Sequence, residues 1–174
     1  MGIFQLVPGR KVRADHIRET TMPYETDRDE IRNIVKRQFE SLSWGRNKRP
    51  DLPAFTDDFI DGASLYPAAR PVRGKSVDAF AGRMQALSQS TLKSLDEQLR
   101  GLDVHVFGNV AVAMAVCELT ENDTEVSRNV EAMLFVRSDG RWRIAAQAWD
   151  TETAEKPVPA ALLNAPQPAD QGDA

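Results

Sequence analysis

Four polar side chains in the second half of the chain have types and spacing that suit acid–base chemistry: His105, Asp103, Glu131 and Asp150. His105 and Asp103 are two residues apart, so both lie on one face of a strand, separated by about 7 Å. An imidazole in the field of a carboxylate is a candidate general base or acid near neutral pH. Two carboxyls in a partly apolar cavity, as expected for Glu131 and Asp150, raise the pKa of one of them and could shuttle a proton.

Each of these candidates also has a structural interpretation that the sequence leaves open. His105 could be a core residue whose ring nitrogens are satisfied by hydrogen bonds. Glu131 and Asp150 could lie in water where the sheet ends. Asp150 follows a run, "RWRIAAQAW", whose side chains shrink from Trp142 and Ile144 to alanines, so it stands either at a pocket or at a strand end.

Four apolar runs must position these residues. The runs are separated by dipeptides that suit tight two-residue turns, namely Gly108-Asn109, Asn122-Asp123 and Asp139-Gly140. We therefore predict a four-strand antiparallel meander over residues 97–107, 110–120, 125–137 and 141–151.

Counting across two-residue turns, with no bulge, assigns every side chain to one of two sheet faces. The face covered by helices carries the four candidate catalytic residues, together with Met114, Met133 and Ala146 as ligand-binding candidates. The opposite face is also too apolar for a sheet wet on one side. A second copy of the chain is its simplest cover, so we predict a homodimer through the face that carries Ala113, Leu134, Ala145 and Trp149.

Helical spacing precedes the strands. It predicts three helices, over residues 27–45, 50–59 and 74–87. Thr26 or Asp27 can cap the first helix and Ser76 the third. A short strand over residues 61–67 separates the last two. Helices followed by a meander form one α+β domain with the helices on one face of the sheet. We assign residues 1–26 to an extended arm, 27–154 to the domain and 155–174 to a Pro/Ala-rich tail.

Three residues of the helical half are further ligand-binding candidates. Asp61 stands at the start of the short strand, Tyr66 precedes Pro67 at the predicted rim, and Met84 lies on the apolar face of the third helix. Asp61 could equally be a loop or capping acid, and Tyr66 a rim aromatic without a ligand.

Composition limits the function classes. A net charge of −4 without a basic tract argues against nucleic-acid binding, and no apolar run approaches the length of about 20 residues that spans a membrane. The single cysteine, Cys117, excludes an internal disulfide and suits a reducing compartment, so we expect a cytoplasmic protein. We expect no metal and no cofactor, because neither ligand spacing nor a glycine-rich phosphate loop is present.

Three stretches resemble the nuclear transport factor 2-like superfamily, which includes the SnoaL-like polyketide cyclases and the ketosteroid isomerases. They are "FTDDFIDGASLYPAARPVRGKSVDAF", "FGNVAVAMAV" and "LFVRSDGRWRIAAQAW". The resemblance covers residues 27–152 and implies a cystatin-like cone, in which helices pack on a strongly curved antiparallel sheet. No catalytic motif of the superfamily is matched: the histidine that many members have near Trp149 or Asp150 is absent.

Two functions remain open on this basis. The first is a homodimeric domain that binds a small apolar metabolite. The alternative is a cofactor-independent lyase, cyclase or isomerase of the SnoaL-like or ketosteroid-isomerase-like type, which would use the buried acids and His105.

Overall fold

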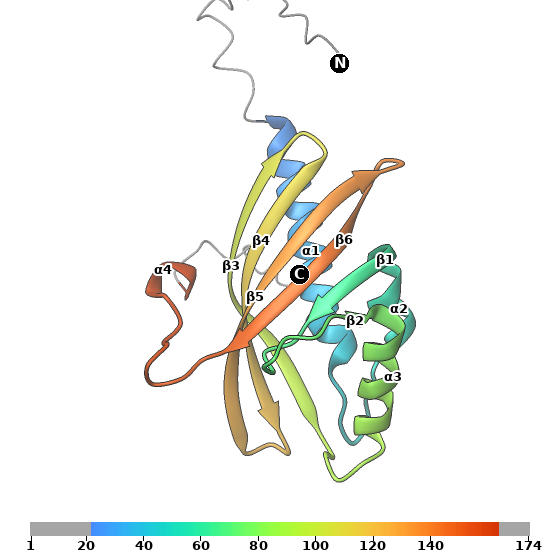
Figure 1. The fold of residues 1–174 in the computed structure, drawn as a ribbon, viewed down its shortest axis with the longest axis vertical. Helices are drawn as coiled ribbons and strands as arrows, with labels where there is room; N and C mark the ends of the chain where they lie inside the picture. Colours follow the sequence, from blue (N-terminus) through green and yellow to red (C-terminus); the bar gives the residue numbers. More distant parts are fainter. Residues whose placement is uncertain (1–21, 164–174) are drawn as a thin grey trace, which may run out of the picture.

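The computed structural model describes residues 22–163, and it confirms an α+β fold in which helices pack on a curved sheet (Figure 1). The six strands lie in the order β2-β1-β6-β5-β4-β3, antiparallel except for β1 beside β6. The helices are α1 (Met22–Leu42), α2 (Leu52–Asp57), α3 (Val77–Ser88) and the short α4 (Ala160–Leu163). The strands are β1 (Phe59–Tyr66), β2 (Lys75–Ser76), β3 (Leu95–Phe107), β4 (Val110–Glu121), β5 (Glu125–Ser138) and β6 (Arg141–Thr151).

Helix α1 begins at Met22, before its predicted start at Asp27. Asp27 is therefore not a cap but a buried residue inside the helix. Its carboxylate accepts hydrogen bonds from Arg137 Nη1 at 2.9 Å and from Trp142 Nε1 at 3.1 Å, which fastens α1 to the β5–β6 hairpin. The remainder of the predicted arm, residues 1–21, and residues 164–174 of the tail lie outside the described residues. No helix within residues 22–163 is long and apolar enough to cross a membrane.

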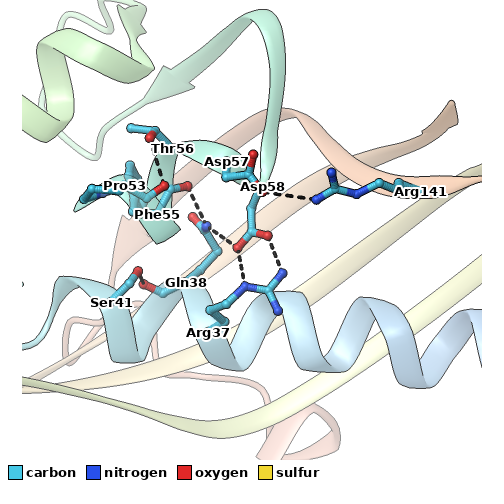
Figure 2. Close-up of polar contacts among 9 residues, drawn as sticks. All are labelled: Arg37, Gln38, Ser41, Pro53, Phe55, Thr56, Asp57, Asp58 and Arg141. Atoms are coloured by element: carbon cyan, nitrogen blue, oxygen red, sulfur yellow. Dashed lines mark hydrogen bonds and ion pairs between the residues drawn. The ribbon is translucent and has the colours of Figure 1, made fainter. Parts of the chain in front are cut away.

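The end of α2 is held against α1 by the buried Asp58 (Figure 2). Arg37 donates to both carboxylate oxygens of Asp58, with its Nε 3.1 Å from Oδ2. Gln38 Nε2 lies 3.0 Å from the same Oδ2 and 3.0 Å from the carbonyl oxygen of Phe55. The neighbouring Asp57 is instead exposed, and it pairs at the surface with Arg141. One acid of this "DD" pair thus joins two helices while the other faces water.

The turn between β4 and β5 differs from the predicted one. Glu121 pairs with Glu125, so the loop has three residues, and it includes Thr124 as well as Asn122 and Asp123. Asn122 and Asp123 take positive φ angles of 50° and 61°, which Asn and Asp tolerate better than most residues. One extra loop residue moves the side chains of β4, and those of β3 from Gly101 to Phe107, to the opposite face relative to the prediction. A bulge at Arg100, between Leu99 and Gly101, reverses the alternation in β3 again, so Leu95, Glu97 and Leu99 point toward the helices.

A β-bulge in β6 changes the faces a second time. Leu134 pairs with Ala146 but Phe135 pairs with Ile144, so Ala145 is the extra residue. Beyond the bulge, Gln147 and Trp149 turn toward the helices. Ala146 and Asp150 turn away from them, so Glu131 and Asp150, which were predicted in neighbouring rows of one face, lie on opposite faces.

The helix-covered and outer faces are consequently exchanged in β4, in most of β3 and in β6 beyond the bulge, whereas β5 keeps its predicted faces. The helix-covered face carries Ala111, Ala113, Ala115, Met133, Phe135 and Ile144, all in the core. The outer face is covered at one end by α4: a Cβ added at Gly101 would lie 2.0 Å from the carbonyl oxygen of Leu162. Further along the same face, apolar side chains are exposed.

Candidate functional site

A cavity of about 330 Å³ lies between the concave face of the sheet and helices α1 and α3. Its apolar wall comes mainly from the helices, and most of its polar groups come from β3, β4, β5 and β6. Ala69 and Arg83 are the exposed residues of the lining and mark the opening. The lining includes Gln38, Phe55, Phe80, Arg83, Met84, Glu97, Leu119, Glu121, Glu131, Gln147 and Trp149.

Aromatic rings form one side of the cavity. The ring centroids of Phe55 and Phe80 are 5.6 Å apart, and those of Phe80 and Trp149 are 5.5 Å apart with nearly perpendicular planes. Met84, predicted from the sequence as a ligand-binding residue, adds a thioether to this wall. Such a wall suits a flat or cyclic apolar group, which it would contact through ring faces and edges.

Glu131 is the polar centre of the site. It points inward from β5, is buried, and accepts a hydrogen bond from Gln147 Nε2 of β6. Burial raises the pKa of its carboxyl to about 7, although the hydrogen bond from Gln147 opposes part of this shift. The pKa of Glu131 therefore lies close to neutral pH, which is the condition for giving or accepting a proton there.

Glu97 of β3 is a second acid in the same cavity, and it was not among the residues predicted from the sequence. Its side chain is buried, and no hydrogen-bond donor contacts its carboxyl among residues 22–163. Burial raises its pKa well above the ordinary value, and the charge of Glu131 raises it further. The two carboxyls thus lie close enough to influence each other's ionisation.

His105 and Asp103 do not belong to this cavity, contrary to prediction. They lie on the outer face, where His105 Nε2 is 2.9 Å from Asp103 Oδ2. Their side chains are 71% and 48% exposed. The three-residue loop between β4 and β5 explains this placement, because it exchanges the faces on which these side chains lie.

Asp150 also lies outside the cavity, because of the bulge. Its carboxylate is 2.6 Å from Lys156 Nζ, and this contact lowers the pKa of Asp150 instead of raising it.

Tyr66 and Asp61 are exposed and do not line the cavity, and Met133 is buried in the core. The outer face carries the other two candidates, Met114 and Ala146.

The residues that were missed carry only a weak sequence signal. Glu97 occupies an apolar position, since Leu95 and Leu99 point the same way from β3. Gln147 and Trp149 were placed on the opposite face because nothing in "RIAAQAW" marks the bulge. Gln38 sits on the buried side of α1 among Val35, Phe39 and Leu42, where a polar residue is uncommon.

Comparison with solved structures gives matches over about three quarters of the chain. An NTF2-like protein of unknown function from Pseudomonas putida has a TM-score of 0.62 at 17% identity, covering 76% of this chain and 92% of that one. A proposed scytalone dehydratase from Novosphingobium aromaticivorans has a TM-score of 0.62 at 10% identity, covering 75% and 87%. A Caulobacter vibrioides protein with a cystatin-like fold has a TM-score of 0.57 at 14% identity, covering 74% and 91%.

Sequence comparison adds nothing to these structural matches: no family model and no curated protein matches the chain. At such low identities the structural similarity establishes the fold alone. The chain has the NTF2-like, cystatin-like fold, as its sequence stretches predict.

Proposed function

We propose that the protein binds a small, largely apolar molecule in the cavity between the helices and the sheet. The observation that carries this proposal is the pairing of an aromatic wall, formed by Phe55, Phe80 and Trp149, with the buried carboxyls of Glu97 and Glu131. Buried carboxyls without a compensating cation reduce stability. Their presence at the one polar end of an apolar cavity supports a role in holding a ligand.

The dimensions of the cavity agree with this function. Small-molecule sites have volumes of roughly 300–1,000 Å³ and are lined mainly by apolar and aromatic side chains with a few polar groups. The cavity of about 330 Å³ lies at the lower end of this range. It therefore suits a compact molecule with one or two rings.

Filling the cavity is expected to abolish binding. Leu119 points into it from β4, so Leu119→Trp should prevent saturable binding of naphthylmethanol, an uncharged aromatic probe that the wild type binds. Val126→Trp is the control, because Val126 is 61% exposed and lies outside the cavity. Fluorescence titration measures both variants. Equal affinity in Leu119→Trp and wild type, with both folded by circular dichroism, would place any binding elsewhere.

A second candidate is a cofactor-independent lyase, cyclase or isomerase. It is favoured by one observation: a cavity carboxyl, Glu131, whose pKa is raised to about 7 and which Gln147 orients. Such a group can take a proton from a bound molecule and return it elsewhere. In this mechanism Glu131 acts alone or with Glu97, and His105 takes no part, because it lies on the outer face.

We also propose that the protein forms a homodimer through the outer face of its sheet. Five apolar side chains are exposed on three neighbouring strands, a density that suits an interface: Phe107, Val110, Val112, Met114 and Leu134. Helix α4 covers only the end of this face near Gly101. The set differs from the predicted one, since Ala113 and Trp149 lie inside the fold.

A charge at the centre of this apolar face is expected to separate the dimer. Val112 lies between His105 of β3 and Leu134 of β5, so Val112→Glu would place a carboxylate within the interface. Sedimentation velocity should show a dimer for the wild type and a monomer for this variant. Val72→Glu serves as the control, since Val72 is exposed but belongs to the loop between β1 and β2. A monomeric wild type would disprove the proposal.

A further inference from the structure

The charges that line the cavity are strongly unbalanced. Of the lining residues in the described part of the chain, three carry carboxyls, namely Glu97, Glu121 and Glu131, and one, Arg83, is basic. Arg83 is exposed at the opening, whereas Glu97 and Glu131 are 8% and 6% exposed. The interior therefore has acids without a basic partner of its own.

Glu97 provides a second, independent indication of a missing partner. Its side chain is more than nine-tenths buried and lines the cavity, yet no described residue donates a hydrogen bond to its carboxyl. Carboxylates buried in proteins are normally paired or hydrogen-bonded. A donor supplied from the cavity would satisfy Glu97.

The two amides of the lining do not supply that donor. Gln147 directs its Nε2 to Glu131, and Gln38 directs its Nε2 to Asp58 and to the carbonyl oxygen of Phe55. Their carbonyl oxygens, Oε1 of Gln147 and of Gln38, are buried and have no hydrogen-bond partner within residues 22–163. The polar part of the lining thus contains acceptors in excess of donors.

We propose that the ligand of this cavity is an organic amine, bound as its ammonium ion between Glu97 and Glu131. This inference rests on the binding function proposed above and adds the chemistry of the ligand's polar group. An ammonium group has up to three N–H donors and a positive charge, which is what the acids and unpaired acceptors lack. Its apolar body would contact Phe80 and Trp149, and aromatic faces also attract cations.

An organic cation fits the lining better than a metal ion. Within residues 22–163, no three His, Cys, Asp or Glu side chains are placed so that they could hold a metal. Most of the wall is apolar, which suits the hydrocarbon part of an amine. A hydroxyl ligand would provide one donor and no charge, and a carboxylate ligand would be repelled by both acids.

The experiment compares three probes with one naphthalene body and different polar groups: naphthylmethylamine, naphthylmethanol and naphthoate. Calorimetric titration of the full-length protein at pH 8 should show the amine binding about tenfold more tightly than the alcohol, because hydrogen bonds to charged groups are the stronger ones. Naphthoate should bind more weakly than either. The shared body isolates the contribution of the polar group.

Substitution of one acid identifies the site. Glu97→Gln keeps the shape of the side chain and removes its charge, so it should reduce the affinity for naphthylmethylamine about tenfold and leave that for naphthylmethanol nearly unchanged. Glu125→Gln is the matched control, because Glu125 is an exposed acid at the start of β5 outside the cavity. A loss of affinity for both probes in Glu97→Gln would indicate a structural role instead.

Proton release gives a readout that packing alone would not produce. Burial raises the pKa of Glu97 well above its ordinary value, so binding a cation should ionise this carboxyl and release its proton to the buffer, whereas Glu131, with a pKa of about 7, is already largely ionised at pH 8. Cys117 stays a neutral thiol because burial raises its pKa as well. The Glu97→Gln variant keeps the other charged groups nearby, which are Asp96 beside Glu97 and the lining residues Glu121 and Arg83. Titration in buffers of different ionisation enthalpy should show proton release with the amine and none with the alcohol.

The outcomes separate this inference from the function on which it rests. Tighter binding of the amine, lost in Glu97→Gln and accompanied by proton release, supports both. If naphthylmethanol or naphthoate binds as tightly as the amine, the cavity binds ligands but the amine inference is overturned. If none of the three probes binds, the proposed binding function fails together with it.

Discussion

An Asp58→Ala variant is expected to be about 2 to 3 kcal/mol less stable than the wild type, because it removes the carboxylate that links the end of α2 to Arg37 and Gln38 of α1. Asp58 is 4% exposed and receives three hydrogen bonds, two from Arg37 and one from Gln38. The effect stays below that of breaking a fully buried pair, since the Arg37 side chain is 45% exposed and can be hydrated once Asp58 is gone. Urea unfolding followed by tryptophan fluorescence measures the change.

The adjacent acid provides the control for this measurement. Asp57 also pairs with an arginine, Arg141, at 3.1 Å, but both side chains are more than half exposed. Asp57→Ala should therefore change the free energy of unfolding by less than about 1 kcal/mol. Similar losses in the two variants would mean that Asp58 does not act as the buried link between the helices that Figure 2 shows.

Most elements of this fold could be predicted from local patterns. All four long strands were located within two residues of their ends, because alternating apolar residues and turn dipeptides mark them. The Asp139-Gly140 turn is the clearest example: Ser138 pairs with Arg141, and both turn residues have positive φ. Helix α1 is the main exception, since its first turn precedes the apolar period that was used to locate it.

The faces of the strands were harder to predict than the strands themselves. An Asn-Asp dipeptide suits a two-residue turn as well as the three-residue loop that also includes Thr124, and nothing local distinguishes the two. That single residue moved His105 and Asp103 from the predicted cavity to the outer face. A face assignment accumulates such errors at every turn, whereas a strand prediction does not.

Glu131 was nevertheless placed correctly inside the fold, and its position in the chain explains why. The unexpected loop residue comes before β5, and the bulge at Ala145 comes after β5. The segment from Glu131 through the Asp139-Gly140 turn to Ile144 therefore contains no irregularity, and its side chains keep their predicted faces. Asp150 lies beyond the bulge, and its predicted position near Glu131 on the helix-covered face was wrong. Residues near a correctly predicted turn keep their predicted face, and distant ones need not.

The stability of the protein is expected to fall as pH rises from about 4.5 to 7, and Glu131→Gln should remove much of this fall. The pKa of Glu131 is raised from its ordinary 4.5 to about 7 by burial. Between these values the folded protein holds a proton that the unfolded chain has lost, so ionisation favours unfolding as pH rises, and the penalty is complete above pH 7. The difference corresponds to about 3 kcal/mol for this one group.

At pH 8 the Glu131→Gln variant should therefore be more stable than the wild type, and at pH 4 the two should be nearly equal. A glutamine at this position can still bond to Gln147, so the shape of the site is kept. Glu97 contributes to the fall in the same direction, because its pKa is also raised, and Glu97→Gln in addition should flatten the profile further. Chemical unfolding at a series of pH values measures these profiles, with the exposed Glu125→Gln as control. If Glu131→Gln were less stable than the wild type at pH 8, the charged carboxylate would be stabilising the fold, and Glu131 would be a structural partner of Gln147 that no ligand is needed to satisfy.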